Sequence, residues 1–349
     1  MSSGAVGGGA LGSAASRLGK KDFESDQAVR WCPGCGDYAI LAQLQKVMPD
    51  LGIPKQNIVF ISGIGCSSRF PYYMDTFGFH TIHGRAPAIA TGLKVSRPEL
   101  SVWVVTGDGD GLSIGGNHLI HALRRNVDLK ILLFNNQTYG LTKGQFSPTS
   151  TTGTRTKSSP LGTVDRPFSV LSLALGAGAT FVARTVDTEV QHLQALIREM
   201  AEHPGSAFLE IYQNCPVLND GVWESLKDRH VKADHLLALE DGQPLVYGKE
   251  SERILRLDTE RMRLVPGLRS EEDGLVEVAH DRAAPDPALA LMLASLAMPE
   301  FPAPIGVLRA VREPTFDSLT RAQEARDREQ SGPGSLQELL EAGSIWTVS

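Results

Sequence analysis

The feature that most constrains the fold is a regular alternation between short β-branched runs and longer helical stretches from about residue 20 to about residue 215. The runs are mainly apolar and show no regular polar alternation, and a stretch with helical character separates each from the next. Parallel strands need such crossovers, and strands without polar alternation are buried on both faces. The pattern therefore predicts an α/β fold in which a parallel sheet lies between two layers of helices.

These predicted elements also indicate where a site would lie. Ligands of such sheets bind beyond the carboxyl ends of the strands, so the polar motifs that follow the strands are the first candidates. The predicted strands cover residues 57–62, 101–106, 129–134, 180–183 and 207–212, and the predicted helices cover 38–48, 88–94, 114–125, 168–175 and 189–202.

The chain divides into three predicted parts. Residues 1–20 are rich in Gly, Ala and Ser and have no apolar periodicity, so we expect them to be disordered. Residues 21–224 hold the alternation and form the predicted α/β domain. Residues 1–224 carry 19 basic and 18 acidic side chains, whereas residues 225–349 carry 15 and 22. The formal charge of −6 therefore belongs to a predicted C-terminal extension, residues 225–349, that wraps the core or a partner.

Composition excludes several classes of protein. Hydrophobic residues make up 42% and charged residues 21%, which excludes a fibrous or wholly disordered chain. No run approaches the roughly 18 apolar residues of a spanning helix, and the N-terminus has no apolar signal core. We therefore expect a cytoplasmic protein without a membrane segment, and the net negative charge argues against nucleic-acid binding.

A glycine-rich turn follows the predicted strand 101–106. The segment VVTGDGDGLSIGG places Asp108 between two glycines at the exit of the strand, and a predicted helix follows. Glycines allow the backbone to approach a phosphate closely, and Asp108 offers a hard oxygen to a divalent cation. Alone, this turn is more typical of an ordinary strand-to-helix connection.

A second polar motif emerges one crossover later. The segment LLFNNQTYG places Asn135 and Asn136 at the end of the next predicted strand, and 25 residues separate Gly109 from Asn135. A right-handed crossover brings Asp108 and Asn136 to the same edge of the sheet. There, a carboxylate and an amide oxygen can share one Mg²⁺ with a diphosphate.

This pair of motifs resembles the diphosphate-binding signature of thiamine diphosphate enzymes, in which GDG is followed one crossover later by NN. The resemblance implies that thiamine diphosphate and Mg²⁺ bind here, with Asp108 and Asn136 as side-chain ligands of the ion and Thr138 as a main-chain ligand. Leu141 resembles the apolar residue that supports the bent cofactor, and a plain packing role for it stays open. Cofactor contacts are expected from Asp108, Gly109, Asp110, Asn136, Thr138, Leu141, Gly34 and Cys35.

Four cysteines form the third feature. Cys32 and Cys35 make one C-x-x-C motif, and Cys66 and Cys215 stand singly at or beyond strand ends. They are too few for a disulfide scaffold. Four thiolates suit a structural zinc or a 4Fe-4S cluster, and the lone C-x-x-C is less typical of zinc. Packing of Cys66 and Cys215, or a redox pair at Cys32 and Cys35, stays open.

Taken together, these motifs resemble the β subunit of 2-oxoacid:ferredoxin oxidoreductases. The resemblance implies that all four cysteines hold one 4Fe-4S cluster next to thiamine diphosphate. It also implies oxidative decarboxylation of a 2-oxoacid with coenzyme A, giving acyl-CoA, CO₂ and reduced ferredoxin. The similar stretches are WCPGCGDY, SGIGCSSR, GFHTIHGRAPAIATGLK, GDGDGLSIGGNHLIHALRRN, LFNNQTYGLTKGQFSPTS and IYQNCPV.

Three basic side chains are candidates for catalysis or substrate binding. Arg69 and Lys143 lie where the family holds substrate carboxylates, with solvated surface cations as the alternative. Because Arg69 offers a bidentate fork to a second carboxylate, we expect 2-oxoglutarate, with pyruvate or a broad range of 2-oxoacids as the alternative. His83 is a candidate for contact with the diphosphate or for proton movement, with simple hydrogen bonding as the alternative.

The chain has room for only one of the two α/β domains that thiamine enzymes use. The resemblance therefore implies an α subunit that carries the pyrimidine-binding domain, in a complex such as α₂β₂, and a chain that is inactive alone. Two other hypotheses stay open. One is a nonoxidative thiamine decarboxylase or synthase with a structural zinc, and the other is a zinc-stabilised subunit without chemistry.

Overall fold

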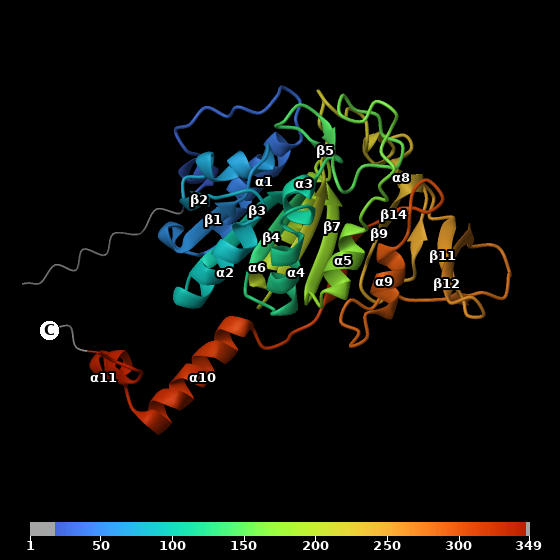
Figure 1. Cartoon of the computed structure of the whole chain (residues 1–349). Helices are drawn as coiled ribbons and strands as arrows, with labels where there is room; N and C mark the ends of the chain where they lie inside the picture. Colours follow the sequence, from blue (N-terminus) through green and yellow to red (C-terminus); the bar gives the residue numbers. More distant parts are fainter. Residues whose placement is uncertain (1–17, 347–349) are drawn as a thin grey trace, which may run out of the picture.

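The computed structural model describes residues 18–346, and an eight-stranded sheet forms its centre (Figure 1). The strands predicted before residue 215 are confirmed, with small shifts of their ends, and one further strand, β2, was not predicted. Parallel pairing joins the first six strands across the sheet. In spatial order they are β2 (Phe77–His80), β1 (Ile58–Ser62), β3 (Ser101–Gly107), β4 (Lys130–Asn135), β8 (Ala207–Tyr212) and β7 (Phe181–Val186).

Helices cover both faces of this sheet. Successive side chains of a strand point to opposite faces, so Val104 of β3 lies in one hydrophobic core and Trp103 lies in the other. The three-layer α/β fold is therefore confirmed. The first core is covered by α2 (Ala86–Ser96), α4 (Gly116–Arg124), α5 (Val170–Gly176) and α9 (Ala288–Ala294), and the second by α1 (Asp37–Val47) and α6 (Val190–Glu202).

The C-terminal part of the chain adds two strands to the main sheet, and the sequence analysis predicted neither of them. β14 (Ala303–Ala310) pairs antiparallel with β7, and β9 (Leu236–Ala238) pairs parallel with β14. The predicted parallel sheet therefore carries one antiparallel strand pair at this edge. The run APIGVLRA is apolar and suits a buried strand, but prolines and mixed charge on either side obscure it in the sequence.

A small antiparallel sheet stands beside the main one. Leu255 and Leu264 of this sheet join the first hydrophobic core, so this part of the predicted extension is packed against the domain. The helices α7 (Glu224–Lys227) and α8 (Lys232–His235) precede it in the chain. Its strands are β10 (Val246–Tyr247), β11 (Arg253–Asp258), β12 (Arg263–Leu268) and β13 (Val276–Glu277).

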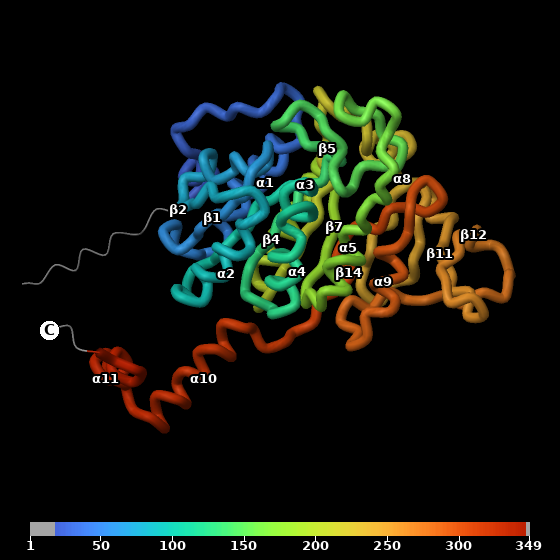
Figure 2. The backbone as a smooth tube through the Cα atoms, viewed as in Figure 1, coloured from blue at the N-terminus to red at the C-terminus, as the bar shows by residue number. Residues whose placement is uncertain are grey.

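The two ends of the described chain differ from the compact body. The disorder predicted for residues 1–20 lies outside the described residues as far as residue 17, and Lys20–Phe23 form a short 3₁₀ helix, η1, with Phe23 fully buried. At the other end, α10 (Phe316–Ser331) and α11 (Leu336–Glu341) stand away from the body (Figure 2). Between residues 18 and 346, every helix is too short or too polar to cross a membrane.

Candidate functional site

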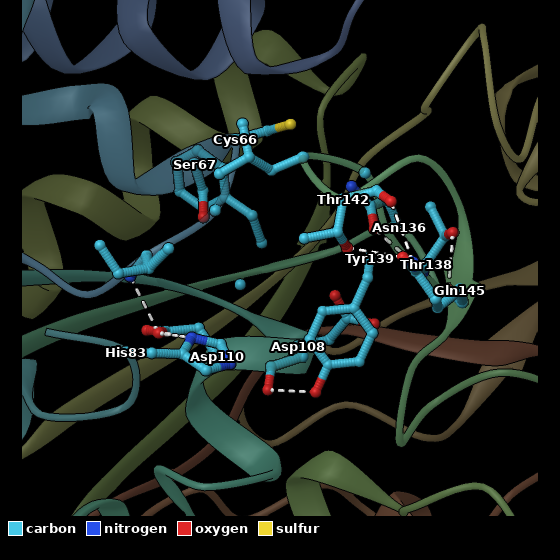
Figure 3. A pocket seen from close by; sticks show the side chains of 17 residues that line it. Cys66, Ser67, His83, Asp108, Asp110, Asn136, Thr138, Tyr139, Thr142 and Gln145 are labelled. Carbon is cyan, nitrogen blue, oxygen red and sulfur yellow. Dashed lines mark hydrogen bonds and ion pairs between the residues drawn. The ribbon is translucent and has the colours of Figure 1, made fainter.

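A cavity of about 500 Å³ lies at the carboxyl ends of the central parallel strands (Figure 3). Its walls come from the segments that follow β1, β3 and β4 and from the hairpin of β5 (Thr138–Tyr139) and β6 (Gln145–Phe146). This is the position at which open parallel sheets bind ligands. Of the predicted site residues, the cavity is lined by Cys66, His83, Asp108, Gly109, Asp110, Asn136, Thr138 and Leu141.

Asp108 is held in one orientation by two hydroxyl groups. It begins the short helix α3 (Asp108–Leu112) directly after β3, and it is buried. Its Oδ2 accepts hydrogen bonds from Ser147 Oγ at 2.5 Å and Thr149 Oγ1 at 2.6 Å. Burial raises the pKa of Asp108 to about 6, and these hydrogen bonds act in the opposite direction because they favour the carboxylate. The result is a fixed carboxylate at the cavity wall.

The two asparagines at the end of β4 face different ways. Asn135 is buried, and its Nδ2 donates to Glu210 Oε1 at 2.8 Å. Asn136 lines the cavity, and its Oδ1 accepts a hydrogen bond from the backbone N–H of Thr138 at 3.1 Å. This turn brings Asn136 and Thr138 to the same cavity as Asp108. A carboxylate, an amide oxygen and a nearby carbonyl are hard ligands, so the residues present fit Mg²⁺.

Asp110 connects three segments of the site. Its Oδ1 accepts hydrogen bonds from the backbone N–H groups of Ile64 and Gly84, at 2.9 and 2.7 Å, and lies 2.7 Å from His83 Nδ1. Its Oδ2 accepts a hydrogen bond from Thr106 Oγ1 at 2.6 Å. Protein donors therefore surround this carboxylate, which indicates a structural role. Direct contact of Asp110 or His83 with a cofactor stays a prediction.

Close packing explains two glycines of the site. A Cβ on Gly63 would lie 2.0 Å from Asp110 Oδ2, and a Cβ on Gly109 would lie 2.4 Å from Tyr139 Cε1. Tyr139 also donates its hydroxyl hydrogen to the Gly109 carbonyl at 2.9 Å. Close packing and a hydrogen bond therefore fix the turn after β3 against the β5–β6 hairpin.

Sequence reasoning missed three residues that shape this site. Ser147 and Thr149 fix Asp108, and Tyr139 fixes the glycine turn. All three lie in the stretch LFNNQTYGLTKGQFSPTS, so the resemblance pointed to the segment. No spacing rule singles out which hydroxyl of a Ser/Thr-rich loop reaches a given carboxylate.

Two basic residues that were predicted to contact the substrate do not line the main cavity. Arg69, on the 3₁₀ helix η4 (Ser67–Tyr72), lines a second cavity of about 390 Å³ together with Arg30 and His80. Its Nη1 donates to the Arg30 carbonyl at 3.3 Å. Lys143 lies in the β5–β6 hairpin with a φ of 84°. Contact of either side chain with a substrate carboxylate stays a prediction.

The segments that carry the four cysteines pack on one another. Cys32 and Cys35 precede α1, Cys66 follows β1, and Cys215 follows β8. Trp31 Nε1 donates to the Cys66 carbonyl at 2.7 Å, which joins the first segment to the second.

Further hydrogen bonds join the first cysteine segment to the last. The Gly36 N–H donates to the Asn214 carbonyl at 3.2 Å, and Gln213 Nε2 donates to Cys35 Sγ at 3.1 Å. Gly34, with a φ of 81°, lies in the same region as Cys35, and neither belongs to the described cavity lining. Their predicted contact with the cofactor stays a prediction.

Burial shapes the chemistry of the cysteine thiols. It raises the pKa of Cys66 to about 12, and the nearby charges of Asp37 and Cys215 add to this effect. Burial also raises the pKa of Cys35. Such thiols ionise when a bound metal stabilises the thiolate. Four free thiols on packed segments fit a 4Fe-4S cluster, and Cys66 connects them to the cavity.

A single-ion site is a different arrangement from a cluster. Within residues 18–346, no three His, Cys, Asp or Glu side chains are grouped as ligands of one metal ion. In a four-iron cluster each thiolate binds a different iron, so this observation does not test a cluster.

Comparison with known proteins defines first a class and then a family. A family model described as "Thiamine pyrophosphate enzyme, C-terminal TPP binding domain" matches residues 63–211, which include both polar motifs. The chain is 50% identical over 331 residues to the 2-oxoglutarate oxidoreductase subunit KorB of Mycobacterium tuberculosis, covering 94% of this chain and 88% of the relative. It is 43% identical over 231 residues to a 2-oxoacid:ferredoxin oxidoreductase subunit beta of a Sulfolobus species, covering 65% and 75%.

A solved structure is similar along nearly the whole chain. It is the 2-oxoglutarate:ferredoxin oxidoreductase of Magnetococcus marinus with 2-oxoglutarate, coenzyme A and succinyl-CoA bound. The TM-score is 0.73 at 33% sequence identity, covering 95% of this chain and 97% of the other. The chain therefore belongs to the family of 2-oxoacid:ferredoxin oxidoreductase β subunits. The resemblance is confirmed, and the chain is a subunit of an oxidoreductase that uses thiamine diphosphate.

Proposed function

We propose that this chain is the β subunit of a complex that oxidatively decarboxylates 2-oxoglutarate with coenzyme A, giving succinyl-CoA and CO₂. The observation that carries the proposal is the 50% identity over 331 residues to a 2-oxoglutarate oxidoreductase subunit. The ligands of the M. marinus structure support the same substrate and cosubstrate. The reaction is reversible in principle.

In this proposal the main cavity holds thiamine diphosphate and Mg²⁺. Asp108 and Asn136 offer their side-chain oxygens to the ion, and Thr138 offers its carbonyl. When bound, thiamine diphosphate supplies the electron sink for decarboxylation. The residues of the chain provide binding and orientation. Ser147 and Thr149 hold the Asp108 carboxylate in place before the ion arrives, so binding requires little rearrangement there.

Cys32, Cys35, Cys66 and Cys215 hold one 4Fe-4S cluster in this proposal, and electrons leave through it to ferredoxin. The packing of the three cysteine segments supports a shared cluster. The presence of Cys66 in the cavity lining supports a short path between the reaction centre and the cluster.

The complex also contains an α subunit with the pyrimidine-binding domain, in an α₂β₂ arrangement in the cytoplasm. Exposed apolar side chains near the cavity support a covering partner. Phe77 and Phe79 on the edge strand β2 are 64% and 49% exposed, and Ile82, next to His83, is 71% exposed. Clustered apolar groups of this kind mark interaction surfaces.

A substrate panel on the coexpressed αβ complex tests the proposal. With coenzyme A and ferredoxin, we expect rapid reduction of ferredoxin with 2-oxoglutarate and much slower reduction with pyruvate. Equal rates would reject the substrate assignment. Iron and sulfide analysis after anaerobic purification tests the cluster, and a protein that contains only zinc would reject it. Full activity of the chain without a partner would reject the role of the α subunit.

A further inference from the structure

Gln213 occupies a buried position directly after β8. Its side chain is 1% exposed, and its backbone N–H donates to the Asn135 carbonyl at 3.0 Å. Its Nε2 donates to Cys35 Sγ at 3.1 Å and to the Asn214 carbonyl at 3.0 Å. The Asn214 carbonyl fixes the orientation of the amide, because only the nitrogen end can donate to both acceptors.

The backbone opposite Gln213 is shaped to let this amide approach. A Cβ on Gly36 would lie 2.8 Å from Gln213 Cγ and 2.0 Å from Asp187 Oδ2. A glycine next to Cys35 therefore allows the glutamine to pack against the cysteine loop.

Folding stability does not explain a glutamine at this position. The Oε1 atom of Gln213 is buried and has no hydrogen-bond partner within residues 18–346. A buried polar atom without a partner destabilises the folded state, so stability alone does not favour glutamine over an apolar side chain of similar length at this position. The N–H that faces Cys35 is the feature that an apolar residue would lack.

We infer that Gln213 is a positioning residue for the iron–sulfur cluster, and that its hydrogen bond to the Cys35 sulfur raises the reduction potential of the cluster. The inference rests on the proposed function, since that proposal assigns the four cysteines to a cluster. A donor to a ligand sulfur stabilises the added negative charge of the reduced cluster. Among the described residues, Gln213 supplies the one side-chain N–H that donates to a cysteine sulfur.

The test uses Gln213→Met and Gln213→Glu in the coexpressed complex. Methionine has a similar length without a donor, and glutamate replaces the donor with a negative oxygen. The midpoint potential of the cluster is measured by a redox titration followed by electron paramagnetic resonance, with iron and sulfide content measured on the same samples. We expect the equilibrium constant for one-electron reduction to fall about tenfold in Gln213→Met, which corresponds to about 59 mV, and further in Gln213→Glu.

Gln43→Met is the matched control. Gln43 is also buried, and its Nε2 donates to the Ala39 carbonyl within α1. We expect this variant to keep the wild-type potential. Equal potentials in wild type and Gln213→Met, or an equal shift in Gln43→Met, would overturn the inference.

Cluster content separates the remaining outcomes. Loss of the cluster from both Gln213 variants would also overturn the inference, since it would show a role in assembly only. A wild-type complex without iron and sulfide would reject the cluster of the proposed function itself. A wild-type complex with a cluster whose potential is unaffected by Gln213 would reject only the role of the glutamine.

Discussion

Replacement of Thr149 by valine tests whether its hydrogen bond orients the Asp108 carboxylate for a metal ion. Thr149 is buried, and valine has nearly the same shape, so the substitution removes the hydroxyl group and little else. The Oδ2 atom of Asp108 then keeps the hydrogen bond from Ser147 and loses the 2.6 Å bond from Thr149. We expect weaker binding of thiamine diphosphate in the presence of Mg²⁺.

The size of the effect follows from the charge on Asp108. A hydrogen bond to a charged group contributes about 1.5–3 kcal/mol, which corresponds to a roughly 10- to 150-fold change in affinity. The lost bond also favours the carboxylate, so its removal raises the pKa of Asp108 further above about 6. Because the metal binds the carboxylate, the loss of affinity in Thr149→Val grows as the pH falls from 7 towards 6.

Isothermal titration calorimetry on the coexpressed complex, stripped of cofactor, measures this affinity. Thr152→Val is the control, because Thr152 is exposed in the same loop and donates to the Asp165 carbonyl instead. We expect Thr152→Val to bind as the wild type does. Wild-type affinity in Thr149→Val at pH 7 and pH 6 would refute the role of this hydrogen bond.

Three further predictions concern stability and specificity. Burial lowers the pKa of His203 from 6.5 to about 4. As the pH falls, this imidazole is therefore protonated in the unfolded chain before it is protonated in the folded chain. The free energy of unfolding should therefore fall between pH 6.5 and 4, and less so in His203→Gln, as chemical denaturation would show. Gly63→Ala should destabilise the fold by about 1–3 kcal/mol because its Cβ meets Asp110, whereas Gly92→Ala, in open space on α2, should not destabilise it. Arg69→Ala should raise KM for 2-oxoglutarate much more than for pyruvate in steady-state assays, and equal effects would contradict the role of Arg69.

Local pattern was enough to predict most of the central sheet. Strands such as β3 and β4 consist mainly of buried apolar residues and alternate with helices, and this periodicity depends only on neighbouring residues. β14 escaped prediction because prolines and mixed charge on either side obscure its apolar run. The antiparallel direction of β14 depends on its long-range pairing with β7, which no local pattern encodes.

The same distinction applies to the site: features set by strand order could be predicted, whereas features set by the packing of loops could not. The placement of Asp108 and Asn136 at one cavity follows from strand order, so the spacing of the two motifs predicted it. The direction of Arg69 depends on the packing of η4, and its distance in sequence from Cys66 gave no information on the cavity it would face. The hydroxyl groups that fix Asp108 likewise depend on how a loop folds back over the sheet.

The position of β14 has a consequence for how the chain is made. β8 ends at Tyr212, whereas β14 begins at Ala303, so during synthesis the edge of β7 emerges long before the strand that will cover it. An open strand edge invites pairing with other chains. A chain that stops before Ala303 therefore carries an uncapped, aggregation-prone edge, whereas a chain that stops after Val311 loses α10 and α11 and retains a complete sheet.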